Sequence, residues 1–354
     1  MKLQYYTTVQ TAWDALFADC TIAKQSIRFE QFILRDFNPG SIGERFVNLF
    51  IAKAKSGVRV RLLLDVVGSY HLVRSPSLKK MRDAGIKIRF ISFQFLKLRD
   101  ILDWTPRRNH RKLAIIDGDV TYIGGVVFSD YAKEWNDFHV RVVGAGRMFA
   151  KAFELVWGEQ KTKSTFQLQS GLHQIPFSLI GNEHDNNLLY KELCSRIKGA
   201  REHITIVTPY FSPGSRLQHL LVKASKRGVS INVVIPARTD HVVAQLAHIS
   251  YIHFAKKENI SIVASKKMNH AKIIYIDEWI TFGSSNFDRL SLFYNKELNI
   301  QTEDPQIISD IEDVAIVPFF KNAKDFADVT KSQYQNRVTR FCLSIIGYLL
   351  RPFI

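Results

Sequence analysis

The sequence predicts an α/β protein made of two related halves, each an α-β-α sandwich with a mixed, largely parallel sheet flanked by helices. Three observations support this fold class. Apolar runs of strand length alternate with helical patterns, the second half repeats the order of the first, and each half carries the same short polar motif. A duplicated unit with one motif per copy predicts pseudo-twofold symmetry, with the functional site at the seam between the halves.

The elements of the first half follow from hydrophobic periodicity and from residues that end helices. Two helical stripes stop at Gly57 and Gly85, and the strands are short apolar runs bounded by turn residues. Helices are expected over residues 8–24, 41–56 and 76–84, and strands over residues 26–34, 58–66 and 86–91. Strands that alternate with helices are joined by crossovers, so we expect neighbouring strands to be mostly parallel.

The second half repeats this order with different loop lengths. The matching segments are residues 193–198, 204–211, 221–229 and 230–235. The pattern breaks near residues 162–182, where polar residues and Gly171 interrupt it. We therefore expect a first half over residues 1–165, a second half over residues 175–333 and a C-terminal amphipathic segment over residues 334–354.

The repeated motif places a histidine and a lysine two residues apart, at His110 and Lys112 and again at His270 and Lys272. No other histidine among the eleven has a lysine at that spacing. Each motif runs into an apolar segment of strand length, and side chains two residues apart lie on the same face of a strand. Each histidine therefore lies beside its lysine, and joined half-sites would gather two imidazoles and two ammonium groups.

An aspartate follows each motif, Asp117 in the first half and Asp277 in the second. Each comes at the end of the apolar run, at the opposite strand parity from the histidine. We therefore expect these two carboxylates to support the site without facing a substrate.

Two further acids occupy the same position relative to the two motifs. Asp137 comes 27 residues after His110, and Glu297 comes 27 residues after His270. A carboxylate bound to one ring nitrogen fixes the tautomer and the orientation of an attacking imidazole. We expect Asp137 and Glu297 to orient the histidines, although either acid could serve either ring. The alternative is that both are exposed acids at strand ends.

Such a combined site suits a phosphodiester. The lysines would stabilise charge on the non-bridging oxygens. One histidine would attack phosphorus and hold a covalent intermediate, and the other would protonate the leaving oxygen and then activate an alcohol or water. The scheme requires no metal ion and no cofactor.

The doubled His-x-Lys-x4-Asp pattern, with Gly283-Ser284-Ser285-Asn286 in the second half, resembles the phospholipase D superfamily. The flanking residues 108–118, 124–125, 135–137 and 270–286 resemble its bacterial cardiolipin synthase branch, and the resemblance covers nearly the whole chain. The expected catalytic residues are His110, Lys112, His270, Lys272, Asp117, Asp277, Asp137 and Glu297. The expected substrate-binding residues are Arg108, Asn109, Gly125, Ser284 and Asn286.

Comparison with the family pattern shows one difference between the two halves. Val127 stands where the family has an asparagine, whereas the second half keeps Asn286. Loss of one donor would cost about 1–3 kcal/mol of phosphate binding, so we expect an asymmetric site. In relatives with two repeats the first-half histidine is the nucleophile, which by resemblance assigns that role to His110.

The composition favours an anionic partner. The net charge is +16, from 49 basic and 33 acidic residues, which suits nucleic acid or an acidic membrane surface. Three scattered cysteines indicate a reducing compartment without a disulfide frame. The N-terminus has no apolar run of signal-peptide length, and the longest apolar run, residues 341–350, is too short to span a bilayer. We therefore expect a soluble or peripheral protein.

Two features favour lipid over nucleic acid. Apolar residues crowd the segment before the first motif, at Phe93, Phe95, Leu96, Leu98, Ile101, Leu102 and Trp104, with basic residues at Arg99, Arg107 and Arg108. The C-terminal segment places Val338, Phe341, Ile345 and Leu349 on one helical stripe, near Arg337, Arg340 and Arg351. A basic amphipathic helix of this kind is typical of membrane-surface binding, and the alternative for both features is core packing.

The resemblance thus implies a cardiolipin synthase-like phosphatidyltransferase that works by a ping-pong mechanism through a phosphohistidine. Its partner would be an anionic, phosphatidylglycerol-like phospholipid on the inner face of the cell membrane, approached from the cytoplasm. The alternatives are a phospholipase D that hydrolyses the same intermediate, a nuclease of the same superfamily, and a membrane-binding protein with a relict site.

Overall fold

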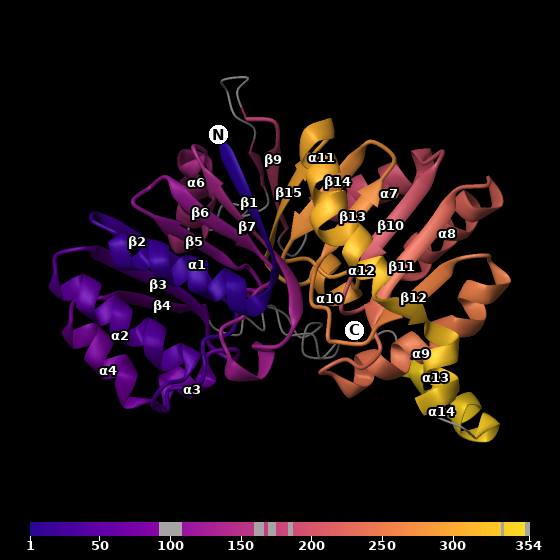
Figure 1. Cartoon of the computed structure of the whole chain (residues 1–354), viewed down its shortest axis with the longest axis horizontal. Coiled ribbons are helices and arrows are strands. Elements are labelled where there is room, and N and C mark those ends of the chain that lie inside the picture. The colour runs from indigo at the N-terminus through magenta and orange to yellow at the C-terminus, as the bar shows by residue number, and fades with distance from the viewer. Residues whose placement is uncertain (92–107, 159–165, 169–174, 183–186, 334–335, 351–354) are drawn as a thin grey trace, which may run out of the picture.

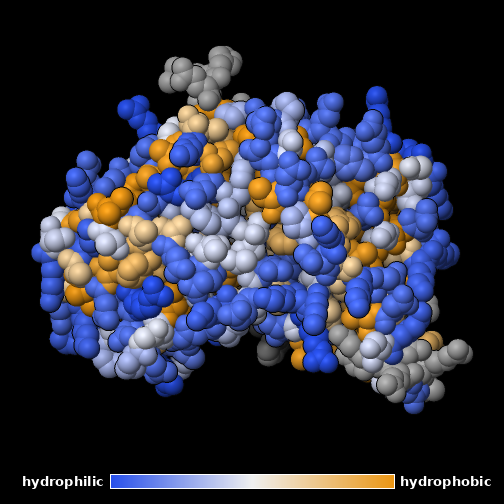
Figure 2. Space-filling view, viewed as in Figure 1, coloured by the Kyte–Doolittle hydropathy of each residue, from blue (hydrophilic) through white to orange (hydrophobic). Residues whose placement is uncertain are grey.

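The computed structural model describes residues 1–91, 108–158, 166–168, 175–182, 187–333 and 336–350. The chain forms two lobes side by side, each built on one sheet with helices packed against it (Figure 1). The face shown in Figure 2 is mainly hydrophilic, with hydrophobic side chains in separate small groups. The expected two-lobed α/β architecture is confirmed.

The first lobe contains a seven-stranded sheet in the order β1-β7-β6-β5-β2-β3-β4. Its strands are β1 (Lys2–Thr8), β2 (Ser26–Gln31), β3 (Arg59–Asp65), β4 (Lys87–Ile91), β5 (Leu113–Ile116), β6 (Val120–Gly124) and β7 (Asn136–Val143). Its helices are α1 (Val9–Ile22), α2 (Ile42–Lys55), α3 (Tyr70–Val73), α4 (Pro76–Asp83), the 3-10 turn η1 (Asp130–Ala132) and α6 (Gly146–Trp157).

The second lobe contains a nine-stranded sheet in the order β16-β12-β11-β10-β13-β14-β15-β9-β8. Its strands are β8 (Phe166–Leu168), β9 (Ser178–Asn182), β10 (His203–Val207), β11 (Ser230–Pro236), β12 (Ser261–Ser265), β13 (Ile273–Ile276), β14 (Trp279–Gly283), β15 (Glu297–Thr302) and β16 (Ala323–Asp325). Its helices are α7 (Leu188–Gly199), α8 (Ser215–Lys226), α9 (Val242–Lys257), α10 (Arg289–Phe293), α11 (Pro305–Ile311), η2 (Glu312–Ile316), α12 (Val317–Lys321), α13 (Phe326–Gln333) and α14 (Arg337–Leu350).

Both sheets are mixed, but the expectation that they are largely parallel was wrong. Only β2-β3-β4 and β10-β11-β12 are joined by parallel pairing, and the other neighbouring strands are antiparallel. One antiparallel pair in each sheet arises just after the motif, where the chain reverses in a tight turn. Asp117 and Asp277 adopt positive φ values of 51° and 49° there, so β6 and β14 return antiparallel beside β5 and β13.

The helix ends follow from local residue chemistry. The Ser41 side chain accepts a hydrogen bond from the Glu44 N–H at the start of α2, and Thr8 does the same for Thr11 in α1. Gly57, just after α2, has a φ of +90°, a conformation in which other residues are strained.

The hydrophobic cores explain how the seam is held. One core packs α1 and α2 on the first sheet through buried side chains such as Trp13 and Phe46. Another contains residues of both lobes, including Phe138 and Phe282, whose rings meet edge to face with centroids 5.3 Å apart. A shared apolar core of this kind fixes the two motifs relative to each other.

The C-terminal helix α14 packs along α9 on the second lobe. A Cβ added to Gly347 would lie 1.9 Å from the Leu246 carbonyl oxygen, so the two backbones are in close contact. Phe341, Ile345 and Leu349 are 63%, 46% and 64% exposed on the outer side of α14. Among the described residues, no helix is long and apolar enough to cross a membrane.

Candidate active site

Short backbone pairings at the seam bring the two motifs together. Asn109 forms a parallel bridge with Lys296, and Asn136 forms one with Asn269. As a result the His110 N–H donates to the Lys296 carbonyl at 3.0 Å, and the His270 N–H donates to the Asn136 carbonyl at 2.7 Å. Each motif histidine is therefore fixed by the residue that precedes the acid of the other lobe.

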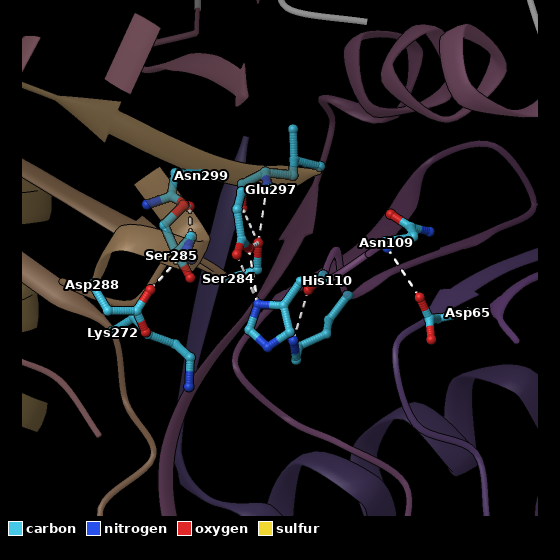
Figure 3. A network of polar contacts seen from close by, with 12 residues as sticks. Asp65, Asn109, His110, Lys272, Ser284, Ser285, Asp288, Glu297 and Asn299 are labelled. Atoms are coloured by element: carbon cyan, nitrogen blue, oxygen red, sulfur yellow. Dashed lines mark hydrogen bonds and ion pairs between the residues drawn. The ribbon is translucent and has the colours of Figure 1, made fainter. Parts of the chain in front are cut away.

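Because of this pairing, each orienting acid contacts the histidine of the other lobe. His110 Nδ1 lies 2.9 and 3.0 Å from the carboxylate oxygens of Glu297. Figure 3 shows the His110 ring directed at this carboxylate. His270 Nδ1 lies 2.9 Å from Asp137 Oδ2. All four side chains are buried. With Nδ1–H donating to a carboxylate, Nε2 of each neutral ring carries the lone pair that a nucleophile or base needs.

The two lysines are buried beside their histidines. Lys112 Nζ donates to the His110 carbonyl oxygen at 2.7 Å, and Lys272 Nζ donates to the His270 carbonyl oxygen at 2.5 Å. Burial lowers the pKa of Lys112 to about 7 and that of Lys272 to about 8, while nearby carboxylates, among them Glu297, oppose the shift. A bound anion would stabilise both ammonium groups.

A cavity of about 370 Å³ opens onto both histidines. An aromatic ring flanks each of them, with Phe32 4.7 Å from the His110 ring and Trp135 5.4 Å from the His270 ring between centroids. The other polar lining residues are Arg108, Tyr131, Tyr210, Asp240, His241, Asn286, Asp288 and Asn295. The cavity is the place where a phosphodiester would meet both imidazoles.

The two histidines differ in their electrostatic surroundings. Burial, followed by Lys112 and Lys272, lowers the pKa of His110 well below its ordinary value. Burial and Lys272 also lower the pKa of His270, but Asp137 and Asp240 oppose that shift. His110 is therefore the more firmly neutral ring, and His270 the more easily protonated one.

Asp117 and Asp277 lie away from the cavity, at the far ends of β5 and β13. Asp117 accepts hydrogen bonds from the N–H groups of residues 24–26 at 2.7–2.9 Å, and Asp277 accepts three from residues 201–203 at 2.9–3.0 Å. Partial burial acts to raise the pKa of Asp117, but these donors lower it overall. Both aspartates tie the turn after the motif to the preceding helix–strand connection.

Arg108 and Asn109 have different surroundings. Arg108 lines the cavity, where its guanidinium pairs with Asp65 at 2.6 Å and lies 4.8 Å from the Phe32 ring centroid. Asn109 is buried, and its side-chain amide donates to Glu30 at 3.0 Å while its backbone N–H donates to Asp65 at 3.1 Å (Figure 3). The Asn109 side chain is thus directed into the first lobe and not into the cavity.

Gly125 and Ser284 occupy equivalent positions behind the orienting acids. Ser284 Oγ donates to Glu297 Oε2 at 2.5 Å. A Cβ at position 125 would lie 2.1 Å from Asp137 Oδ1, so glycine is needed for the carboxylate to sit there. Neither residue lines the cavity, whereas Asn286 and Val127 do. The two lobes therefore present a carboxamide on one wall and an isopropyl group on the other.

Sequence reasoning missed several polar residues that line the cavity, among them Tyr210, Asp240 and Asp288. Tyr210 donates its hydroxyl to Asp240 at 2.6 Å, and these residues are 30 positions apart with no local pattern that links them. Asp288 accepts from the Ser291 N–H at 2.7 Å as the N-cap of α10, and burial raises its pKa to about 6. Only the capping role of Asp288 had a sequence signal, an aspartate before a short helix.

Part of the predicted lipid-facing surface lies outside the described residues. This applies to Phe93, Phe95, Leu96, Leu98, Ile101, Leu102, Trp104, Arg99 and Arg107, and to the side chains of Arg337, Val338, Arg340 and Arg351. On α14 the described members of the expected stripe, Phe341, Ile345 and Leu349, are all on the outside.

Comparisons with known proteins agree with this geometry. Residues 17–152 and 193–315 match the family described as cardiolipin synthase, PLD-like domain. Minor cardiolipin synthase ClsB of Bacillus subtilis is 28% identical over 84% of this chain and 76% of its own length. Cardiolipin synthase of Oceanobacillus iheyensis is 29% identical over 94% of this chain and 71% of its own length.

A solved structure shares the fold at low sequence identity. Phosphatidylserine synthase of Haemophilus influenzae superposes with a TM-score of 0.76 at 12% identity, covering 99% of this chain and 95% of that one. The doubled histidine–lysine motif, the crossed carboxylates and the match over most of both halves lead to one assignment. The chain belongs to the phospholipase D superfamily, in its cardiolipin synthase-like family.

Proposed function

We propose that the protein is a phosphatidyltransferase that makes cardiolipin-like products. It would take a phosphatidyl group from one phospholipid and pass it to a hydroxyl of phosphatidylglycerol. The observation that carries the proposal is the pair of buried imidazoles, each held at Nδ1 by the acid of the other lobe, at one cavity beside two buried lysines. The curated relatives named as cardiolipin synthases support the choice of substrate.

In the first step, Nε2 of His110 attacks phosphorus. A phosphorus–nitrogen bond forms, the bond from phosphorus to the leaving alkoxide oxygen breaks, and His270 donates a proton to that oxygen. The Lys112 and Lys272 ammonium groups stabilise the charge that builds on the non-bridging oxygens. Asp137 and Asp240 favour the protonated form of His270 that this step requires.

In the second step, the acceptor hydroxyl attacks phosphorus and gives its proton to His270. The new phosphorus–oxygen bond forms as the phosphorus–nitrogen bond breaks, and His110 leaves as a neutral ring. Burial and the neighbouring lysines, which hold the pKa of His110 low, make this ring a suitable nucleophile and leaving group. The attacking role therefore goes to His110 and the acid–base role to His270.

The proposed substrate surface is an anionic membrane, approached by a peripheral protein from the cytoplasmic side. The outward apolar side chains of α14 and the net charge of +16 support this proposal. We propose that residues 1–165 and 175–333 are the two phospholipase D-like halves and that residues 334–354 form the membrane-contacting tail.

The test is an assay of the purified full chain on labelled phosphatidylglycerol vesicles and, separately, on single-stranded DNA. We expect cardiolipin and glycerol from the vesicles, no DNA cleavage, and no effect of a chelator on the rate. Phosphatidic acid as the sole lipid product would identify a hydrolase, and cleaved DNA would identify a nuclease. Loss of activity in chelator that zinc or magnesium restores would contradict the metal-free scheme.

A further inference from the structure

We propose that Asp240 and Tyr210 form a subsite that binds hydroxyl groups of the acceptor alcohol on the His270 side of the cavity. This inference rests on the proposed phosphatidyl transfer and identifies the residues that select the acceptor. Neither residue belongs to a motif, and both come from the second lobe, Tyr210 just after β10 and Asp240 in the loop before α9.

The contacts place this pair beside the acid–base histidine. Tyr210 donates its hydroxyl to Asp240 Oδ1 at 2.6 Å, and its ring lies edge to face with His270, with centroids 6.5 Å apart. Both residues line the cavity, and the Asp240 side chain is 21% exposed. Asp240 Oδ2 lies 3.7 Å from His241 Nε2, which is too long for a hydrogen bond. Among the described residues no hydrogen bond to Oδ2 is found, so this oxygen can accept one from a ligand.

The chemistry of the pair selects hydroxyl groups. A carboxylate only accepts hydrogen bonds, and it repels phosphate. Burial, followed by Asp240, raises the pKa of Tyr210 well above its ordinary value, so the phenol keeps its proton for Asp240. The Tyr210 oxygen can then accept one further bond. The pair thus offers two adjacent acceptors, which suits neighbouring hydroxyls on a glycerol group better than a single isolated one.

The difference in charge between the two cavity walls indicates which wall the acceptor would contact. The described lining residues of the first-lobe wall of the cavity include Arg108, Phe32, Val127 and Tyr131, and no carboxylate. Its second-lobe wall carries the carboxylates Asp240 and Asp288. An acceptor that places hydroxyls on the acidic wall also brings one of them to the side where His270 can remove its proton.

The same carboxylates would attract an ammonium head group, but the site already holds cations. The charge of Asp240 acts on both His270 and Lys272, and the other half-site contributes a second buried lysine, Lys112. A further cation would be repelled by these groups, whereas a neutral polyol adds hydrogen bonds without adding charge. We therefore favour the hydroxyl ligand.

The test measures acceptor choice in the full chain. The donor is a phosphatidyl p-nitrophenol, whose leaving group needs little protonation, offered together with equal concentrations of glycerol, ethanol and ethanolamine. Asp240→Asn replaces one acceptor oxygen by a donor, and Tyr210→Phe removes the phenol oxygen. We expect each variant to lower the ratio of glycerol to ethanol product, by about tenfold for Asp240→Asn.

The ratio separates acceptor binding from effects on His270, because a change in His270 acts equally on all acceptors. Asp83→Asn, an exposed carboxylate on α4 paired with Lys79 at 2.8 Å, is the matched control and should leave the ratio unchanged. Equal losses with glycerol and ethanol would overturn the subsite. A larger loss for ethanolamine than for glycerol would show that the pair binds ammonium.

Failure of the transferase proposal would look different. If the wild-type protein releases p-nitrophenol but forms no phosphatidyl alcohol in any mixture, it is a hydrolase. This outcome would reject both the transferase proposal and the acceptor subsite. Wild-type protein that makes alcohol products, with variants that keep its glycerol preference, would retain the transferase proposal and reject only the subsite.

Discussion

Glu297 of the second lobe binds Nδ1 of His110 of the first lobe, at 2.9 and 3.0 Å. Asp137 and His270 repeat the contact in the opposite direction at 2.9 Å. Each half thus supplies a histidine that only the other half can orient. A separated half would keep its motif but lose the hydrogen bond that fixes its ring.

The crossed contacts predict which step each acid supports. Glu297→Gln should slow formation of the phosphohistidine by about 100-fold, because the His110 ring loses its charged partner. Asp137→Asn should slow mainly reactions with poor leaving groups, since it acts on the acid His270. Rapid-quench kinetics on donors with good and poor leaving groups measure both effects. The opposite assignment of the two variants would show that each acid serves its own half.

Adduct trapping separates the roles of the histidines. His110→Ala and His270→Ala should each abolish turnover of phosphatidylglycerol while the circular dichroism spectrum stays that of the wild type. On a donor with a very good leaving group, His270→Ala should still form an adduct at His110, because little protonation is needed. His110→Ala should form none. A phosphorylated peptide containing His270 in the His110→Ala protein would reverse the assignment.

The buried lysines predict an alkaline limit to substrate binding. Their pKa values of about 7 for Lys112 and about 8 for Lys272 mean that both lose their positive charge as pH rises. The value of kcat/KM should therefore fall as pH rises above about 7 and more steeply above about 8, and kcat should fall at higher pH because bound phosphate stabilises the ammonium groups.

An arginine substitution tests this origin of the pH profile. Lys272→Arg should lower the rate and move only the steeper, upper part of the alkaline limb of kcat/KM to higher pH, because arginine keeps its charge while Lys112, with a pKa of about 7, still titrates. Lys79→Arg, on the exposed surface of α4, is the control and should not move it. If the alkaline limb of kcat/KM is the same in Lys272→Arg as in the wild type, a group other than Lys272 causes it.

The close approach of Gly125 to Asp137 predicts a strong effect of one added methyl group. Gly125→Ala would place Cβ 2.1 Å from Asp137 Oδ1, so the carboxylate, whose Oδ2 contacts His270 Nδ1, must move away. We expect turnover to fall by about 100-fold and the melting temperature to decrease. Gly199→Ala, where nothing lies within 4 Å of the added Cβ, should change neither by much. Wild-type turnover in Gly125→Ala would contradict the role given to this glycine.

The exposed stripe of α14 predicts membrane affinity that is separable from folding. Replacing Phe341 and Leu349 by serine should weaken binding to anionic vesicles in a sedimentation assay, and high salt should weaken it further. Val317→Ser, at a position that is 54% exposed on α12, is the matched control. Deletion of residues 334–354 should also weaken binding to anionic vesicles. Unchanged vesicle binding in the serine variants would make the stripe an inert surface.

The sequence by itself determined the local part of this site. Strand periodicity predicted His110 beside Lys112 and His270 beside Lys272. Each pair is adjacent in the structure, although β5 and β13 begin only after the lysines. The duplication determined that there are two such half-sites, and the equal spacing identified Asp137 and Glu297. Periodicity did not determine strand direction, and the tight turns at Asp117 and Asp277 set it only for β6 and β14.

Tertiary structure alone decided which groups meet. The choice between crossed and uncrossed acids depends on the pairing of Asn109 with Lys296 and of Asn136 with Asn269, residues far apart in the chain. The same packing directs Asn109 toward Glu30 and brings Tyr210 to Asp240 beside His270. A sequence pattern reports on neighbours along one strand or helix, whereas these contacts exist only once the apolar faces of both lobes are buried against each other.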